Sequence, residues 1–213
     1  MPTSHETNGS RPWRLAVLIS GSGRTLRNLL DVIERGDLDA KIVCVASSRS
    51  GVMGLDIASD AGIPAYTITG KANPGPDRYA RAMYEVLEPH APDMVVMAGF
   101  LRHLPVYPGW EGRILNIHPA LLPEAGAYAA GKGMYGDRVH QAVIDHGDTV
   151  SGATVHVVTQ VYDEGPPLLR AEVPVLPDDT MQTLAARVFA EECVLYPEAI
   201  RRYLAAHPEL KRG

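Results

Sequence analysis

A chain of 213 residues, 46% of them hydrophobic, is long enough to bury the core of one domain. The net charge of −5 and a pI near 5.9, without a basic stripe, exclude an extended nucleic-acid-binding surface. Cys44 and Cys193 are the only cysteines and lie in apolar surroundings, which excludes a disulfide framework, and no apolar run approaches a membrane span in length. We expect a cytoplasmic protein that binds neither nucleic acid nor membrane.

The chain divides into a polar N-terminal tail over residues 1–13, expected to be disordered, one domain over 14–206 and a C-terminal tail over 207–213. Within the domain, short apolar runs alternate with segments of helical spacing. Strands are predicted at 15–20, 41–46, 65–68, 94–98 and 114–117, and helices at 25–35, 54–61, 77–87 and 137–145. Strands that are apolar throughout are typical of a parallel sheet covered on both faces. The pattern predicts an α/β fold with a single doubly wound, mostly parallel sheet.

The C-terminal part departs from this alternation. Predicted strands over 154–159 and 168–175 are separated only by "QVYDEGPP", which is too short for a crossover helix. An antiparallel C-terminal extension of the sheet is expected here, followed by a long helix over 180–205 that contains Pro197.

The first candidate motif is the glycine loop "SGSGRTL" at 20–26, which follows a strand and opens a helix. Free N–H groups and the helix dipole at such a turn suit a single phosphate. A dinucleotide fingerprint is not met, because Leu26 occupies the third glycine position. The second strand also ends in Ser47–Arg49 rather than in a ribose-binding acid.

A second glycine-rich segment, "GAYAAGKG" at 126–133, is close to a phosphate-binding P-loop. Gly133 replaces the Ser or Thr that would hold magnesium, and no strand precedes the segment. We expect a flexible, glycine-hinged loop beside the active site, from which Lys132 could reach an anion.

The strongest signal is "ILNIHPALLP", in which Asn116 and His118 interrupt an apolar strand. Residues two apart on a strand point to the same side, and ligands of doubly wound folds bind at the carboxyl ends of the strands. An amide beside an imidazolium suits a developing oxyanion. Asp163, in "YDEGP", is a candidate to pair with His118 and keep it protonated. His156 alternates with valines and is expected to be structural, and the histidines show no metal-ligand spacing.

With these residues in hand, the chain resembles the folate-dependent phosphoribosylglycinamide formyltransferase family from Leu15 to about Tyr203. The matching segments are "LISGSGRTL", "DMVVMAGFLRHL", "GRILNIHPALLP", "GATVHVV", "YDEGP" and "EECVLYP". The resemblance implies a Rossmann-like formyltransferase fold and transfer of the formyl group of 10-formyltetrahydrofolate to the amine of N1-(5-phospho-D-ribosyl)glycinamide in purine biosynthesis. The formyl donor is a co-substrate, and no metal is implied.

The resemblance also implies roles for individual residues. Asn116, His118 and Asp163 match the catalytic trio. The positions implied for the ribonucleotide are Gly23, Arg24, Thr25 and Glu192, and those implied for the folate are Leu101, Arg102, His103, Leu104, Asn116, Thr159, Gln160, Val161, Tyr162 and Asp163.

The sequence departs from the family's commoner pattern in two places. Arg24-Thr25 stands where Ser-Asn is more common, and the segment after "LLP" is longer. An arginine of the family's early helical region has no clean match, although Arg78 lies near.

Three alternatives share parts of this pattern. A methionyl-tRNA formyltransferase is expected to add a C-terminal domain with a basic surface, and a formyltetrahydrofolate deformylase an N-terminal regulatory domain. A non-catalytic nucleotide-binding protein would not require the trio. The partners expected are the two small-molecule substrates, in a monomer or homodimer.

Overall fold

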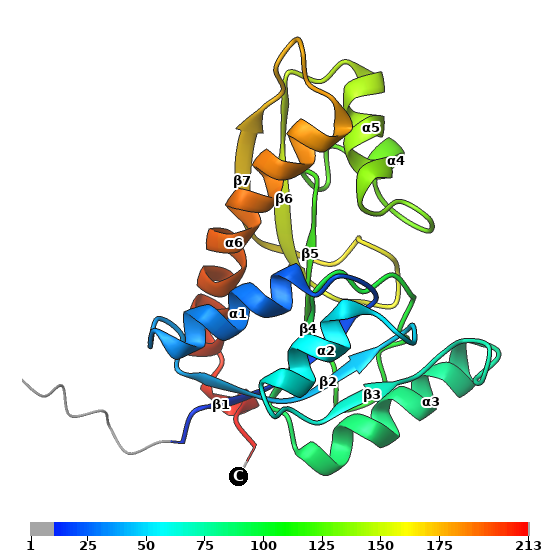
Figure 1. Cartoon of the computed structure of the whole chain (residues 1–213), viewed down its shortest axis with the longest axis vertical. Coiled ribbons are helices and arrows are strands. Elements are labelled where there is room, and N and C mark those ends of the chain that lie inside the picture. The colour runs from blue at the N-terminus through cyan, green and yellow to red at the C-terminus, as the bar shows by residue number, and fades with distance from the viewer. Residues whose placement is uncertain (1–10, 213) are drawn as a thin grey trace, which may run out of the picture.

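Seven strands form one sheet at the centre of the computed structural model, which describes residues 11–212 (Figure 1). Residues 1–10 of the predicted tail over 1–13 therefore lie outside the described residues. The strands are β1 Trp13–Ile19, β2 Ala40–Ser47, β3 Ala65–Thr67, β4 Met94–Met97, β5 Ile114–His118, β6 Val150–Val157 and β7 Pro167–Pro174. The helices are α1 Arg24–Glu34, α2 Met53–Asp60, α3 Pro76–Leu87, α4 Gly126–Ala129, α5 Asp137–His146 and α6 Met181–Ala206, with 3₁₀ turns η1 Glu88–His90 and η2 Pro208–Leu210.

The order of strands across the sheet is β3-β2-β1-β4-β5-β6-β7. Pairing is parallel from β3 to β5 and antiparallel from β5 to β7. This confirms the predicted doubly wound sheet with an antiparallel extension. The chain reverses its direction of travel across the sheet between β1 and β4, and a crevice at such a switch point is where ligands of open α/β sheets bind.

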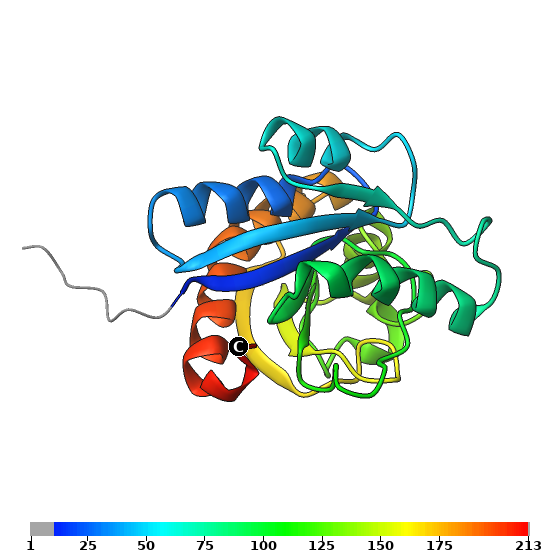
Figure 2. The same cartoon turned by 90° about the horizontal axis from the view of Figure 1, so that it is seen from below.

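Each face of the sheet has its own apolar core. Leu26 and Leu29 of α1 pack on one face together with residues of α2, α5 and α6. Tyr79 and Met83 of α3 cover the other face, together with Trp110 from the connection between β4 and β5. Figure 2 shows α3 on the opposite side of the sheet from α1. Because both faces are covered, the strands can be apolar throughout.

Two segments differ from the sequence-based expectation. Strand β6 begins at Val150, four residues before the predicted start. Gly152 explains this, because a Cβ there would lie 1.9 Å from the Ala171 carbonyl oxygen, so only glycine lets β6 approach β7 so closely. The expected glycine loop also contains the short helix α4, whose Ala129 is fully buried.

The two ends of the described chain meet at one buried carboxylate. Asp93, at the N-terminal end of β4, accepts hydrogen bonds from both Nη atoms of Arg11, at 2.7 and 2.9 Å. The backbone N–H groups of Arg14 and Arg212 donate to the same carboxylate, at 2.9 and 2.7 Å. Arg11 precedes the predicted start of the domain at residue 14, and Arg212 follows its predicted end at residue 206. The described fold therefore reaches from Arg11 to Arg212. No helix within that range has the length and apolar character needed to cross a bilayer.

Candidate active site

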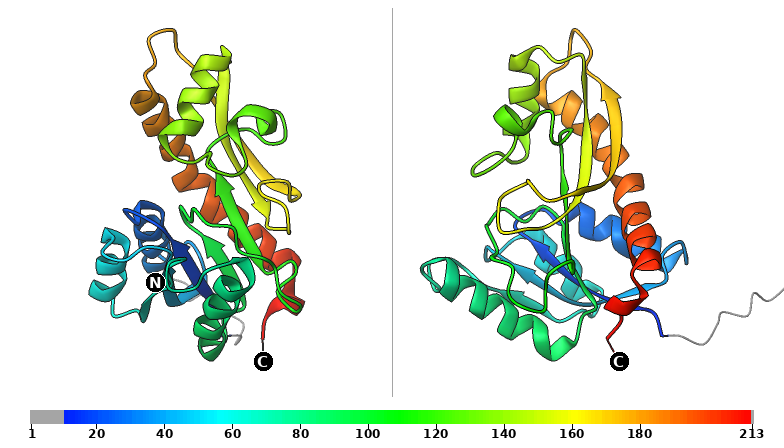
Figure 3. Two further views of the ribbon diagram at one scale, coloured as in Figure 1. Left: turned by 90° about the vertical axis from the view of Figure 1, so that its right-hand side faces the viewer. Right: turned by 180° about the vertical axis from the view of Figure 1, so that it is seen from behind.

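Strand β5 carries Asn116 and His118 to the carboxyl edge of the sheet, as their spacing predicts. There they line a cavity of about 320 Å³ together with residues that follow β1, β4 and β6. The connection after β4 and the loop after β6, green and yellow in Figure 3, meet at this edge, where the His103 Nε2 lies 2.9 Å from the Gln160 carbonyl oxygen. The cavity therefore forms at the switch point of the sheet.

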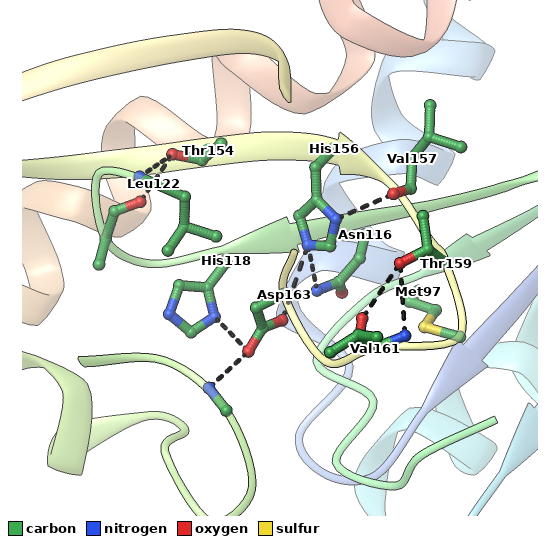
Figure 4. A network of polar contacts seen from close by, with 12 residues as sticks. Met97, Asn116, His118, Leu122, Thr154, His156, Val157, Thr159, Val161 and Asp163 are labelled. Carbon is green, nitrogen blue, oxygen red and sulfur yellow. Dashed lines mark hydrogen bonds and ion pairs between the residues drawn. The ribbon is translucent and has the colours of Figure 1, made fainter. Parts of the chain in front are cut away.

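Asn116 is fixed by a neighbour across the sheet. His156 on β6 lies directly opposite Asn116 in the antiparallel register, so the two side chains meet on one face. The His156 Nδ1 lies 3.2 Å from the Val157 carbonyl, to which it donates, and its Nε2 is 3.1 Å from the Asn116 Nδ2 (Figure 4). In neutral His156, Nε2 is then the acceptor for one amide N–H of Asn116. The second amide N–H of Asn116 is left for a ligand.

His118 is buried and both of its ring nitrogens face polar groups. Nε2 lies 2.7 Å from the carbonyl oxygen of Ala129 in α4, to which it donates. Nδ1 lies 3.7 Å from the Asp163 Oδ2, and the other oxygen of Asp163 lies 3.7 Å from the His156 Nε2 (Figure 4). Asp163 therefore sits between the two imidazoles, as the sequence predicts for His118 but not for His156.

Asp163 adopts a backbone conformation that is rare for a residue with a side chain, with φ of 53°. The Gly131 N–H holds it there by donating to Oδ2 at 2.9 Å, so the glycine-rich segment after α4 contacts the carboxylate directly. A strained residue at a site is a marker of function when its surroundings determine it, as they do here.

The pKa values of His118 and Asp163 are both shifted below their ordinary values. Burial lowers the pKa of His118, and the opposing attraction of Asp163 does not restore it. Burial acts to raise the pKa of Asp163, but His156, His118 and the Gly131 N–H outweigh it and hold that pKa below its ordinary value. Burial and Asp163 thus act in opposite directions on the pKa of His118, and the attraction of Asp163 offsets the effect of burial only in part.

The glycine loop after β1 forms the second part of the cavity. Gly23 has φ of 74°, and a Cβ there would lie 2.6 Å from the Cα of Gly54, so only glycine fits this turn. Helix α1 begins directly after it without a side-chain cap or an acid in its first turn. Arg24 and Thr25 line the cavity at this helix N-terminus, where free N–H groups and the dipole suit an anion.

Glu192 and His140 also line the cavity, and the charge of Arg24 acts on both. Burial raises the pKa of Glu192 to about 7, with Arg24 as the opposing cation. Burial lowers the pKa of His140 to about 4, and its Nδ1 has no hydrogen-bond partner among the described residues. This region thus offers a neutral imidazole, a carboxyl group that titrates near neutral pH, and a cation.

Most residues of the segments implied to bind folate also line the cavity. Leu101–Leu104 and four residues of the loop after β6, Thr159, Val161, Tyr162 and Asp163, are among the lining residues. Gln160 is not among them, because its side chain turns away and bonds the backbone of Val106 at 3.2 and 2.6 Å. It holds the two segments together, as does the contact between the rings of His103 and Tyr162, with centroids 4.9 Å apart.

Some expected residues do not join the site, and others were missed. Lys132 and Arg78 are exposed and do not line the cavity. His140 and His156 do line it, although the sequence singled out neither for the site. The pattern of His156 between valines was visible, but its register opposite Asn116 was not. Within residues 11–212, no group of three or more His, Cys, Asp or Glu side chains is arranged to hold a metal ion.

Comparison with known proteins bears on this site. The sequence model of the formyl transferase family matches residues 13–200. A phosphoribosylglycinamide formyltransferase of Escherichia coli (strain K12) is 35% identical over 188 residues, which cover 87% of this chain and 84% of that protein. The trifunctional purine biosynthetic protein adenosine-3 of Bos taurus is 40% identical over 190 residues, 88% of this chain, but the match spans only 18% of that longer protein.

The fold is shared with solved structures as well. The crystal structure of glycinamide ribonucleotide transformylase 1 from Symbiobacterium toebii superposes with a TM-score of 0.85 at 37% identity, covering 96% of this chain and 94% of that one. Sequence and fold therefore agree over nearly the whole of the described chain.

Proposed function

The chain belongs to the formyl transferase family, and from that premise we infer that it is a phosphoribosylglycinamide formyltransferase of purine biosynthesis. The observation that supports this most directly is the contact network of Asn116, His156, Asp163 and His118 at the edge of a cavity. The substrates proposed are glycinamide ribonucleotide and 10-formyltetrahydrofolate, and the reaction as proposed needs no metal.

In the proposed reaction the amine of the ribonucleotide attacks the formyl carbon of the donor. A C–N bond forms, and negative charge collects on the formyl oxygen. The free amide N–H of Asn116 and an N–H of His118 would stabilise that charge. The bond between the formyl carbon and N10 of the folate then breaks, and the proton lost by the amine replaces it on N10.

His118 must change partners to take part. Its Nε2–H is donated to the Ala129 carbonyl, and its other nitrogen faces Asp163. We expect the formyl oxygen to replace that carbonyl, which requires α4 to shift. As negative charge develops on the oxygen it favours protonation of His118, and Asp163 would then stabilise the cation. Asp163 would in this way assist by stabilising the charged form of His118.

The two regions that flank this centre suggest where each substrate lies. The helix N-terminus at Gly23–Thr25, with Glu192, is proposed to bind the phosphate and ribose of the ribonucleotide. Leu101–Leu104 and the loop over 159–163 are proposed to bind the folate. Both regions border Asn116 and His118, which is where the amine and the formyl group must meet.

The test is to mix the protein with 10-formyltetrahydrofolate, with and without glycinamide ribonucleotide, and to follow the folate absorbance. Turnover that requires the ribonucleotide is expected. Turnover without it would indicate a deformylase, and no turnover with retained ligand binding would indicate a binding protein. We expect the enzyme in the cytoplasm. We also expect a monomer or a homodimer, and sedimentation at assay concentrations would distinguish these two states.

A further inference from the structure

Arg24 is held by an aromatic ring rather than by a carboxylate. Its Cζ lies 4.1 Å from the centroid of the Phe189 ring on α6. Among the described residues, no hydrogen bond or ion pair fixes the guanidinium, and the side chain is otherwise exposed. An exposed arginine has many rotamers, so this contact restricts where its charge points.

The contact between Arg24 and Phe189 lies where two cavities meet. Arg24 and Phe189 both line the active-site cavity and both line a neighbouring groove between α1, α2 and α6. The guanidinium therefore lies on the boundary between the two and could turn into either. Phe189 is one helical turn before Glu192, so α6 presents a ring and a carboxyl group to the same stretch of α1.

Stacking on a ring leaves an arginine able to bind an anion. The ring covers the face of the guanidinium, whereas the five N–H donors lie in its plane and point outward. Arg24 can thus keep its contact with Phe189 while it donates to a phosphate at the N-terminus of α1. Fixing the side chain before binding lowers the entropy lost when the complex forms.

We propose that Phe189 is a positioning residue that holds Arg24 toward the phosphate of the ribonucleotide and so sets the affinity for that substrate. This inference rests on the proposed function, because it needs an anionic substrate at the glycine turn. Phe189 acts through Arg24 and does not touch the reacting atoms.

A double-mutant cycle tests it, with ribonucleotide affinity measured by calorimetry on Phe189→Leu, Arg24→Ala and the double variant. Phe189→Leu removes the ring and should weaken binding roughly two- to five-fold, the range of an exposed cation–π contact. Phe189→Tyr keeps the ring and should bind like the wild type. In the Arg24→Ala background, Phe189→Leu should cause no further loss.

Steady-state kinetics supply a second readout. In Phe189→Leu the KM for the ribonucleotide should rise while kcat changes less, and folate affinity should be unchanged. Equal weakening by Phe189→Leu with and without Arg24, or no weakening at all, would overturn the role of Phe189. A wild-type protein that neither binds nor formylates the ribonucleotide would instead overturn the proposed function.

Discussion

Asn116 and His118 lie side by side at the cavity because a single strand fixes their spacing. Both side chains leave β5 on the same side, and each has one partner that sets its orientation: His156 for the amide and Ala129 for the imidazole. Neither partner is close in sequence, so the trio depends on strand pairing and on the placement of α4. In the proposed reaction, both side chains would donate to one oxygen once His118 releases the Ala129 carbonyl.

Removal of either donor should therefore abolish most of the turnover. Asn116→Ala and His118→Ala are each expected to lose roughly 100- to 1,000-fold in the rate of formyl transfer, the usual effect of losing one donor to an oxyanion. Asp163→Asn should also slow the reaction, because the charged form of His118 loses its partner. Single-turnover experiments with both ligand affinities measured in parallel will show this. A wild-type rate in His118→Ala would assign His118 a purely structural role.

Glu192 should make the stability of the protein depend on pH. Its pKa is about 7 in the folded protein, against an ordinary value of 4.5, so the folded state binds more protons between these values. Stability contributed by this group is therefore lost as the pH rises from about 4.5 to about 7. Glu192→Gln should raise the free energy of unfolding at pH 8, by roughly 3 kcal/mol at most, and by little near pH 4.5.

Urea denaturation at several pH values will measure this difference. Glu191→Gln, at the exposed neighbouring position, is the matched control. If both variants show the same pH dependence, burial of the Glu192 carboxyl group is not what destabilises the protein at high pH.

At the scale of elements, the parallel half of the sheet was predictable and the antiparallel half less so. Buried runs such as "MVVMA" and "KIVCVA" are apolar throughout, so they identify their strands directly. The start of β6 was missed because Ser151 and Gly152 lack strand character and pair only through the close approach of β7. His156 was read as structural for a related reason, since register between strands depends on contacts that no local pattern records.

The segment from Gly126 to Gly136 makes several contacts with residues at the site and beside it. Ala129 accepts from His118, Gly131 donates to Asp163, and Tyr128 anchors the start by stacking on His146, with ring centroids 4.0 Å apart. The part beyond that anchor, up to α5, is rich in glycines with positive φ. We therefore expect this segment to shift when the substrates bind.

Substrate binding should therefore order this segment. Hydrogen exchange over 126–136 is expected to slow when both substrates are saturating, because the segment closes over them. Peptides from α3, over 76–87, serve as the internal control. Unchanged exchange across the segment would contradict the idea that it moves in the catalytic cycle.

At the scale of the whole molecule, Asp93 accepts hydrogen bonds from both ends of the described chain and so holds them at the sheet. It is fully buried, and although burial acts to raise its pKa, Arg11 and the N–H groups of Arg14 and Arg212 hold that pKa below the ordinary value. The stability it contributes is present above the pKa of an unfolded aspartate and is lost as the pH falls through the lower folded value.

Asp93→Ala should destabilise the protein by roughly 2 to 4 kcal/mol, because several donors lose a buried acceptor at once. Arg11→Ala should have a smaller effect, since the two backbone N–H groups keep their partner. Denaturant titration compares the two variants. Equal losses would mean that the ion pair, rather than the shared carboxylate, provides the stability.

The meeting of Arg11 and Arg212 at one carboxylate also governs how this domain can be joined to others. Both ends of the described chain lie at the N-terminal end of β4, whereas the cavity opens at the carboxyl ends of the strands. A neighbouring domain fused at either end would be attached on the side of the sheet opposite the cavity. Ends that lie together also suit circular permutation, in which a short linker bridges them and a new break is made elsewhere. The cavity would thus stay open in a chain joined to another domain at Arg11 or Arg212.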